Sequence, residues 1–190
     1  MGREGQSTRQ PVPAVFFDRD GVLIEATVRD GRPYPPRSAD DVRLDPHAVD
    51  AVLSLRAAGF ALAVVTNQPD VARGTATAEA VRAVNARTAE LLGIAPESFF
   101  TCLHDDADGC SCRKPGPGLV LRAARHCGAD LSRSFVVGDR WRDVGTAHRA
   151  GCAAVWIDRG YRERRPDPPY HRVPSLARAV AVALGGHGGR

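Results

Sequence analysis

Short apolar runs alternate with segments of helical pattern along the chain, and this alternation constrains its fold more than any other feature. The apolar runs expected to be strands lie at 14–17, 60–65, 98–103, 134–137 and 153–157. The segments expected to be helices lie at 46–58, 77–92, 117–127, 142–150 and 175–184. Strands that alternate with helices are typical of βαβ units, in which a parallel sheet is covered by helices on both faces. We therefore predict an α/β fold, a three-layer sandwich with a central parallel sheet.

Residues at the expected element ends support this assignment. Asp45 can cap the first helix, with Pro46 in its first position and Gly59 at its end. Thr77 and Gly93 bracket the second helix in the same way. The segments 25–45 and 160–173 are rich in proline and charged residues, and we expect both to be loops.

The length of 190 residues fits one domain. We expect a disordered lead at 1–12, a single domain at 13–185 and a flexible tail at 186–190. A hydrophobic fraction of 43% with 25% charged residues argues against wholesale disorder. No apolar run approaches the roughly 18 residues that span a bilayer, and the first residues lack the apolar core of a signal peptide. We expect a soluble, cytoplasmic monomer with no membrane partner.

The charge pattern also indicates which classes of partner the chain could bind. The net charge is only +4, and the basic residues are scattered, with no run longer than Arg164-Arg165. This pattern does not favour a nucleic-acid partner. Of the 26 basic residues, 25 are arginine and one, Lys114, is lysine. Because a compact ammonium and a planar guanidinium are not interchangeable in a tight site, position 114 is a candidate functional position.

Polar residues follow three of the expected strands. They are Asp18-Arg19-Asp20-Gly21, Thr66-Asn67-Gln68 and Gly138-Asp139-Arg140. Ligands of open α/β sheets bind outside the carboxyl ends of the strands, so these residues form the candidate site.

Asp18 and Asp20 are two residues apart on an extended segment, which directs both side chains the same way. Two neighbouring carboxylates need a cation or a shared proton, and oxygen ligands suit Mg²⁺. A carboxylate can also attack phosphorus and form an aspartyl-phosphate. The alternative is an ordinary turn rich in aspartate after a strand.

Further residues fit phosphate chemistry. The Thr66 hydroxyl and the backbone N–H groups that follow it could hold phosphate oxygens, and Lys114 could neutralise a transferring phosphoryl group. Asp139 offers a third carboxylate for Mg²⁺. Asp143 could hold Lys114 in place, or it could simply be a favourable acid in the first turn of a helix.

Three of the five cysteines lie within 11 residues. Cys102, His104, Cys110 and Cys112 make a four-ligand set of three thiols and one imidazole, which is typical of a closed, structural Zn²⁺ site. The alternative is free thiols beside a polar loop histidine. Cys127 and Cys152 stand apart among small residues, and we expect them to pack as small hydrophobic side chains.

Four short motifs occur in a fixed order: FFDRDGV at 16–22, VVTNQ at 64–68, RKP at 113–115 and VGDRWRD at 137–143. Together they resemble the signatures of the haloacid dehalogenase superfamily of phosphatases. The resemblance implies that Asp18 is the nucleophile and Asp20 the general acid and then base. It implies a Mg²⁺ ion bound by Asp18, Asp139 and the backbone carbonyl of Asp20, and a phosphate bound by Thr66 and Lys114.

The cysteine-rich loop directly before RKP is similar to that of the histidinol-phosphate and heptose-bisphosphate phosphatases within this superfamily. That similarity implies that Arg113 contacts a second phosphate or the body of the substrate. The residues taken as the substrate- and phosphate-binding set are Arg19, Thr66, Asn67, Gln68, Arg113, Lys114 and Arg140. Only 44 residues separate Gly21 from Thr66, so we expect no cap domain.

We therefore expect a Mg²⁺-dependent phosphatase with a structural Zn²⁺, whose partner is a small phosphorylated metabolite. A sugar bisphosphate is expected first, namely D-glycero-D-manno-heptose 1,7-bisphosphate at its 7-phosphate. Histidinol phosphate is the alternative substrate. A receiver-like signalling module that is phosphorylated without turnover is the non-enzymatic alternative. A zinc-dependent interaction module would not explain Asp18, Asp20, Thr66 and Asp139 together. Two aspartates on one strand place an acid/base beside the nucleophile, which favours turnover.

Overall fold

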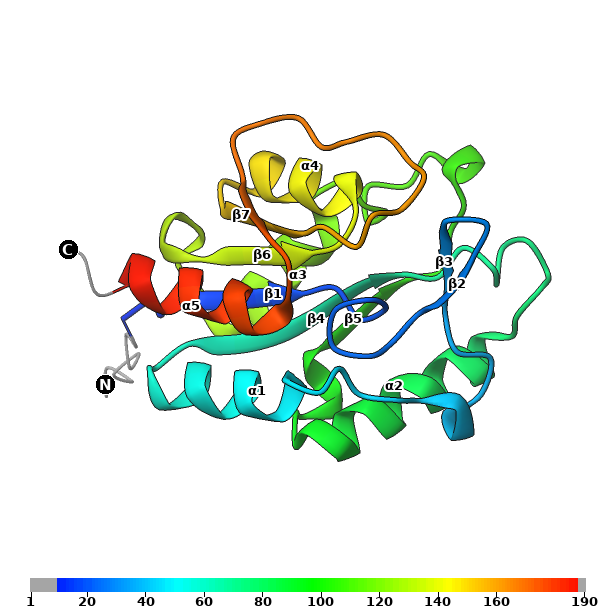
Figure 1. Cartoon of the computed structure of the whole chain (residues 1–190), viewed down its shortest axis with the longest axis horizontal. Coiled ribbons are helices and arrows are strands. Elements are labelled where there is room, and N and C mark those ends of the chain that lie inside the picture. Colours follow the sequence, from blue (N-terminus) through cyan, green and yellow to red (C-terminus); the bar gives the residue numbers. More distant parts are fainter. Residues whose placement is uncertain (1–9, 188–190) are drawn as a thin grey trace, which may run out of the picture.

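The computed structural model describes residues 10–187; residues 1–9 of the lead expected at 1–12 and residues 188–190 of the tail expected at 186–190 lie outside the described residues. A six-stranded sheet with the order β5-β4-β1-β6-β7-β8 forms the centre, and every adjacent pair of its strands is parallel (Figure 1). The predicted α/β sandwich with a central parallel sheet is therefore confirmed.

Most elements lie within one or two residues of their expected positions. The strands of the sheet are β1 (Ala14–Phe17), β4 (Ala61–Asn67), β5 (Phe99–Cys102), β6 (Phe135–Gly138), β7 (Ala153–Ile157) and β8 (His171–Val173). The helices are α1 (Ala48–Ala57), α2 (Ala78–Leu92), α3 (Gly118–Cys127), α4 (Trp141–Ala150) and α5 (Leu176–His187). Short 3₁₀ turns lie at Ala39–Asp41, Pro96–Ser98, Asp106–Asp108 and Leu131–Arg133.

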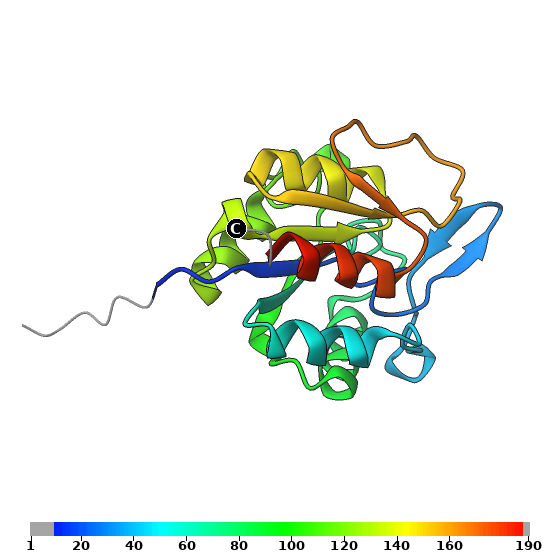
Figure 2. The same cartoon turned by 60° about the vertical axis from the view of Figure 1, so that its left-hand side comes forward.

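The centre of the sheet is buried on both faces, because β1 and β6 are apolar and buried at every position and β4 is apolar over its first five residues. Val15 and Phe17 of β1 pack into the core beneath α1 and α5, whereas Ala14 and Phe16 pack into the core beneath α3 and α4. This alternation follows from the two-residue period of a strand. The two helical layers are visible on opposite sides of the sheet in Figure 2.

Two strand pairings occur where loops were expected. Within 25–45, β2 (Thr27–Arg29) and β3 (Arg32–Tyr34) form an antiparallel hairpin. Asp30 and Gly31 form its turn with φ values of 51° and 74°, and two positive φ values are the mark of a tight hairpin turn that Asp-Gly favours. Within 160–173, β8 adds to the edge of the sheet beside β7. It has only three residues, and two of them are exposed, so no apolar run marks it.

The ends of two helices test the expected caps. Thr77 caps α2 through a hydrogen bond of 3.0 Å from the Ala80 N–H to its hydroxyl, and Gly93 ends that helix with φ of 58°, as predicted. The expected cap of α1 is wrong, because His47 occupies the N-cap position. Asp45 instead accepts a hydrogen bond from the His47 N–H and pairs with Arg159 at 2.9 Å.

The domain extends slightly beyond the expected limits at both ends. Val12 lies in the expected lead, yet it exchanges backbone hydrogen bonds with Gly128 and Asp130 at 3.1 and 2.8 Å. At the other end, α5 continues to His187 instead of ending before 185. No helix within residues 10–187 is both long and apolar enough to cross a membrane.

Candidate active site

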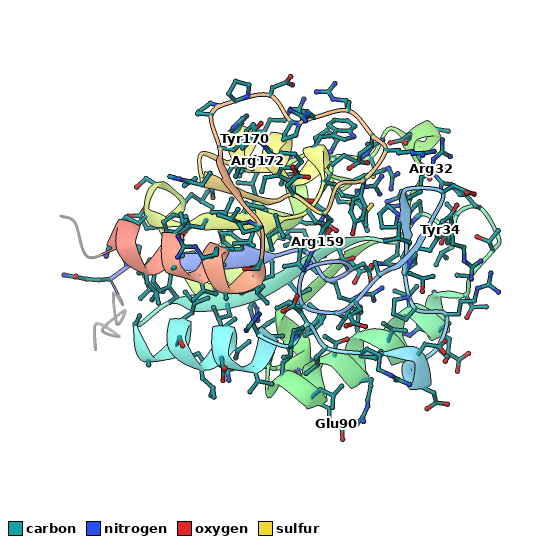
Figure 3. All side chains as sticks on the ribbon, in the orientation of Figure 1. Arg32, Tyr34, Glu90, Arg159, Tyr170 and Arg172 are labelled. Carbon is teal, nitrogen blue, oxygen red and sulfur yellow. The ribbon has the colours of Figure 1, made fainter. Side chains whose placement is uncertain are left out.

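The carboxyl ends of β4, β1 and β6 are neighbours in the sheet, and a cleft of about 150 Å³ opens beside them. From the predicted set, the cleft is lined by Asp18, Asp20, Asn67, Gln68, Lys114, Arg140 and Asp143. Its other walls come from Pro33–Pro35 of the hairpin and from Pro69, Asp70, Arg73 and Arg142. Tyr34 on β3 thus stands at this edge of the molecule (Figure 3).

Lys114 is buried at the centre of the site, with only 2% of its surface exposed. Its Nζ lies 2.9 Å from Asp18 Oδ1, 2.6 Å from Asp143 Oδ1 and 2.9 Å from the carbonyl oxygen of Val65. The three N–H groups of the ammonium thus meet three oxygens. The expected contact between Asp143 and Lys114 is present.

The charges of this cluster are strongly coupled. Burial raises the pKa of Asp18 to about 6, although the Lys114 ammonium opposes the rise. Burial likewise raises the pKa of Asp139, and the neighbouring Asp18 and Asp143 carboxylates add to the shift. Burial alone would lower the pKa of Lys114, but Asp143 and Asp18 override it and raise that pKa above its ordinary value. Lys114 is therefore a fixed positive charge among carboxylates.

Asp20 is held by two neighbours. The Arg19 guanidinium donates to both of its carboxylate oxygens at 3.0 and 3.1 Å, and Gln68 Nε2 donates to Oδ2 at 2.6 Å. Arg19 is fully buried and also donates to Asn85 Oδ1 at 2.6 Å. Arg19 therefore orients Asp20, and it lines the cavity next to the cleft, which shares Tyr34 and Gln68 with it.

Thr66 and Asn67, at the end of β4, make hydrogen bonds with other residues of the site. The Thr66 hydroxyl is buried and accepts a hydrogen bond of 2.8 Å from Gln68 Nε2. The Asn67 side chain exchanges two hydrogen bonds with the backbone of Lys114, at 3.0 and 3.1 Å. Asn67 thereby fixes the chain segment that carries the lysine.

Asp139 is the residue that best fits a metal ion. Its Oδ2 accepts a hydrogen bond from the Tyr161 hydroxyl at 2.9 Å, whereas its buried Oδ1 has no hydrogen-bond partner among the described residues. Ligand oxygens of Asp18, Asp139 and Asp143 lie within 4.8 Å of one another. A buried carboxylate oxygen without a partner is costly unless a cation satisfies it, and oxygen ligands suit a hard cation such as Mg²⁺.

Asp143 belongs to this group by position, but its two oxygens are already engaged. Oδ1 pairs with Lys114, and Oδ2 accepts the Arg140 N–H at 3.0 Å. It therefore supports the site from the first turn of α4.

Gly21 lies close to Asp139 and has a φ of 77°. A Cβ at this position would lie 1.9 Å from Asp139 Oδ2. Only glycine fits this close approach.

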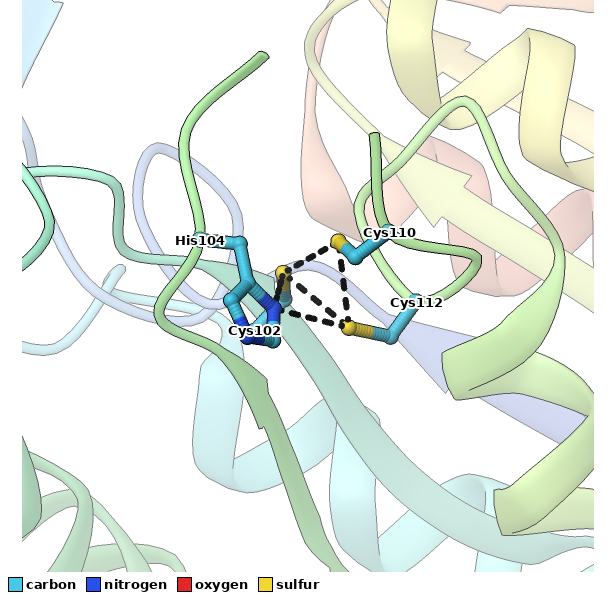
Figure 4. A group of neighbouring side chains, drawn as sticks. All are labelled: Cys102, His104, Cys110 and Cys112. Carbon is cyan, nitrogen blue, oxygen red and sulfur yellow. Dashed lines mark hydrogen bonds between the residues drawn. The ribbon is translucent and has the colours of Figure 1, made fainter. Parts of the chain in front are cut away.

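The four predicted soft ligands meet at the end of β5 (Figure 4). Distances between the Sγ atoms of Cys102, Cys110 and Cys112 are 3.3 to 3.7 Å, and His104 Nδ1 lies 3.3 and 3.6 Å from two of them. Tetrahedral zinc with bonds of about 2.3 Å to sulfur requires ligand separations of about 3.7 Å. The cluster could therefore hold a tetrahedral metal ion through three sulfurs and Nδ1.

This cluster lies directly before Arg113 and Lys114. The chain turns tightly after it, with a hydrogen bond of 2.7 Å from the Gly116 N–H to the Arg113 carbonyl. A Cβ at Gly118 would lie 2.5 Å from the Ser111 carbonyl oxygen, so the backbone segments are in close contact. A metal in the cluster would therefore fix the segment that delivers Lys114.

The other two arginines of the predicted substrate set, Arg113 and Arg140, also have partners within the protein. Arg113 donates to Asp106 at 2.8 Å and to the His104 carbonyl at 3.2 Å, so its guanidinium lies on the cysteine-rich loop. Arg140 lines the cleft and pairs with Glu163 at 2.6 Å.

Two arginines that sequence reasoning missed also line the cleft. Arg142 makes two hydrogen bonds to Asp106, at 3.0 and 3.1 Å, and Arg73 makes two to Asp105, at 2.7 and 2.8 Å. The adjacent residues Asp105 and Asp106 thus hold Arg73 and Arg142. We call the arginines that line the cleft, Arg73, Arg140 and Arg142, its arginine rim.

Other residues of the site were also missed. They are Tyr34, Asn85, Tyr161 and Glu163. Arg142 stands inside the motif VGDRWRD, and Tyr161 and Glu163 follow the strand at 153–157, so the strand-end rule could have found these three. Asn85 lies in the middle of a helix and contacts Arg19 across 66 residues, and no local signal marks it.

The fold and the carboxylates at its strand ends define a hydrolase of the haloacid dehalogenase type. Residues 111–179 match the family model described as HAD-hydrolase-like. A heptose-bisphosphate phosphatase from Bordetella bronchiseptica, solved with magnesium and phosphate, superimposes with a TM-score of 0.76 at 27% identity, over 91% of this chain and 98% of that one.

Relatives with similar sequences indicate the family within this superfamily. A D-glycero-beta-D-manno-heptose-1,7-bisphosphate 7-phosphatase of Pseudomonas aeruginosa is 34% identical over 90% of this chain and 96% of its own length. A protein of the same name from Mesorhizobium japonicum is 34% identical over 82% and 73%. The chain therefore belongs to the heptose-bisphosphate phosphatase family of the haloacid dehalogenase superfamily. The resemblance drawn from the sequence motifs is confirmed.

Proposed function

We propose that the chain removes the 7-phosphate of D-glycero-D-manno-heptose 1,7-bisphosphate through an aspartyl-phosphate on Asp18. One observation carries the chemistry: a buried carboxylate at the end of β1 lies 2.9 Å from a lysine ammonium, with Asp20 two residues further on. The names of the relatives support the substrate.

Asp18 is proposed to act as the nucleophile. The Arg19 N–H and Lys114 both contact Oδ1, at 2.7 and 2.9 Å, so Oδ2 is the oxygen that neither of them occupies. Attack by Oδ2 forms a bond to phosphorus while the bond from phosphorus to the sugar oxygen breaks. Lys114 lies beside the developing charge, and its ammonium stabilises the transferring group.

Asp20 is proposed to move the protons. In its protonated form it gives a proton to the departing sugar oxygen, and as a carboxylate it then takes a proton from the water that attacks the phosphorylated Asp18. Inorganic phosphate leaves and both aspartates return to their starting state. The hydrogen bonds from Arg19 and Gln68 keep the carboxyl group of Asp20 in one orientation.

Two metals are proposed. Asp18, Asp139 and the backbone carbonyl of Asp20 would hold Mg²⁺, which supplies positive charge to the phosphate and to the clustered carboxylates. The unpartnered Oδ1 of Asp139 supports this assignment. Cys102, His104, Cys110 and Cys112 would hold Zn²⁺ with no open position, so its part is to order the loop before Lys114.

The zinc assignment predicts a loss of metal in Cys110→Ser. We expect this variant to contain much less zinc and to melt at a lower temperature, because structural zinc contributes directly to folding. Turnover should fall as well, since Lys114 is delivered by the same loop. Elemental analysis and thermal unfolding measure these effects.

Cys127→Ser is the matched control, because Cys127 lies in α3 and donates to the Ala123 carbonyl instead. It should keep its zinc. Wild-type protein purified without a chelator that contains no zinc would contradict the assignment.

A second phosphate of the substrate is proposed to bind at the arginine rim of the cleft. The sequence-based candidates are Arg113 and Arg140, and the cleft position of Arg142 adds a third. A guanidinium binds phosphate through two parallel hydrogen bonds, whereas the cationic end of histidinol phosphate would be repelled there. This favours a bisphosphate over histidinol phosphate.

Arg142→Ala should therefore lower kcat/KM for the 1,7-bisphosphate by roughly 10- to 100-fold, the worth of a charged hydrogen bond, and should change the 7-monophosphate little. Arg113→Ala should show the same asymmetry if its guanidinium turns from Asp106 to the ligand. Arg87→Ala, an exposed site on α2 that pairs with Glu90, is the control. Equal losses on both substrates would remove the rim from the binding site.

A phosphate-release assay tests the function as a whole. Heptose 1,7-bisphosphate, its 7-monophosphate and histidinol phosphate are compared with Mg²⁺ and with a chelator. We expect many turnovers, the highest kcat/KM with the bisphosphate, and no activity in the chelator. A preference for histidinol phosphate would favour the alternative enzyme, and a single equivalent of phosphoprotein without turnover would favour a signalling module.

A further inference from the structure

Residues 159–164, here called the strap, connect the end of β7 to the loop that arches over α4 on its way to β8 (Figures 1 and 2). Several strap residues contact the cleft region. The Arg159 guanidinium, labelled in Figure 3, donates to the Gly21 carbonyl at 3.0 Å, and the Arg162 N–H donates to the Gly31 carbonyl at 2.8 Å. The strap therefore touches both the turn after β1 and the tip of the hairpin.

The same strap is anchored to the segment after β6. Glu163 pairs with Arg140 at 2.6 Å, and the Arg164 guanidinium lies 4.2 Å from the ring centre of Trp141. Tyr161 stands between these anchors. Contacts on either side of it in the sequence therefore fix where its hydroxyl group points.

That hydroxyl donates to Asp139 Oδ2 at 2.9 Å. The backbone of Asp139 is fixed separately, because Trp156 Nε1 donates to its carbonyl at 3.0 Å. Gly21 closes off the remaining space: a Cβ there would lie 1.9 Å from Oδ2 and 2.8 Å from the Tyr161 oxygen. With Oδ2 held by Tyr161, the unpartnered Oδ1 is the oxygen that remains for a cation.

We infer that Tyr161 is a positioning residue for the cation site. It holds the Asp139 carboxylate in an orientation that engages Oδ2 and leaves Oδ1 for a cation. The inference rests on the proposed function only in taking Asp139 as a ligand of Mg²⁺. Hydrogen-bond partners of metal-ligating side chains typically contribute 10- to 100-fold to metal affinity, because they fix the orientation of the ligand.

Tyr161→Phe removes one hydroxyl group and keeps the ring, so it isolates this hydrogen bond. Binding of Mn²⁺, used as a probe for Mg²⁺, is measured in the absence of substrate by calorimetry or electron paramagnetic resonance. We expect an affinity about tenfold or more below that of the wild type. Tyr170→Phe is the matched control, because Tyr170 packs against the edge of Trp156 at 5.5 Å between ring centres. It should bind Mn²⁺ like the wild type.

A second measurement separates positioning from general stability. The Mg²⁺ concentration for half-maximal activity should rise in Tyr161→Phe by about the factor lost in Mn²⁺ affinity, and saturating Mg²⁺ should restore most of kcat. Wild-type Mn²⁺ affinity in this variant, whatever its melting temperature, would overturn the inference. An equal loss in Tyr170→Phe would also overturn it.

These outcomes are distinct from failure of the proposed function. Wild-type protein that binds Mn²⁺ but turns over none of the phosphorylated substrates would contradict the phosphatase and leave the role of Tyr161 standing. Tyr161→Phe with unchanged Mn²⁺ affinity, in a protein that hydrolyses heptose bisphosphate, would contradict the positioning role alone.

Discussion

Asp18→Asn is expected to reduce turnover at least about a thousandfold, because it removes the atom that would form the bond to phosphorus. An amide is neutral, a poor nucleophile and a poor ligand for Mg²⁺. The substitution also removes one negative charge from a buried cluster in which Asp18 has a pKa raised to about 6. The fold should survive, since the amide oxygen can still accept the Arg19 N–H.

Phosphate release at saturating substrate and Mg²⁺ measures the effect, with thermal unfolding as the check on the fold. Asp50→Asn makes the same chemical change at an exposed position of α1 and should leave activity unchanged. Acid quenching during turnover should trap phosphoprotein in the wild type and none in Asp18→Asn. Activity of Asp18→Asn within tenfold of the wild type would exclude Asp18 as the nucleophile.

Lys114→Arg should lower kcat by about a hundredfold even though it keeps the positive charge. The ammonium fits a buried space in which three oxygens lie within 2.9 Å of Nζ. A guanidinium is larger and planar and cannot direct its hydrogens at the same three oxygens. Overfilling this space should also destabilise the protein by roughly 1–3 kcal/mol.

Arg149→Lys is the reverse change on the neighbouring surface, where Arg149 donates to the Pro115 carbonyl, and it should cost little. Comparing kcat and the midpoint of denaturant unfolding for both variants separates loss of chemistry from loss of stability. If Lys114→Arg kept a third or more of the wild-type kcat, the shape of the ammonium would not matter and charge alone would suffice.

The core of the site could be predicted because parallel strands bring their carboxyl ends to one edge. Asp18, Thr66 and Asp139 each follow a buried apolar run, and β4, β1 and β6 are neighbours in the sheet. The cluster of Cys102, His104, Cys110 and Cys112, which could hold a metal ion, was predictable for a different reason, since all four lie within 11 residues of sequence. In both cases the decisive information is local in the chain or fixed by a general topological rule.

What could not be predicted depends on contacts between distant segments. Arg19 was expected to bind substrate, and its burial against Asp20 and Asn85 was not foreseen. Its partner lies on α2, and only the packing of that helix decides the contact. The small strand β8 exists because the edge of β7 is available to pair with it, not because its own three residues favour a strand.

The hairpin is a different case, because its signal was present. Asp30-Gly31 is a strong local indication of a two-residue turn. The flanking residues Thr27–Arg29 and Arg32–Tyr34 are mostly exposed and include a proline, so hydrophobic alternation does not reveal them. Here the turn was more informative than the strands.

The pairing of Arg73 and Arg142 with adjacent carboxylates of one turn has a consequence for selectivity. An anion that binds either guanidinium competes with Asp105 or Asp106, each of which carries a single negative charge. A monoanionic ligand exchanges like for like and gains little, whereas a dianionic phosphate brings twice the charge. We therefore expect these arginines to select ligands by the size of their charge and not merely by its sign, with Asp105 and Asp106 acting as internal competitors against carboxylate metabolites.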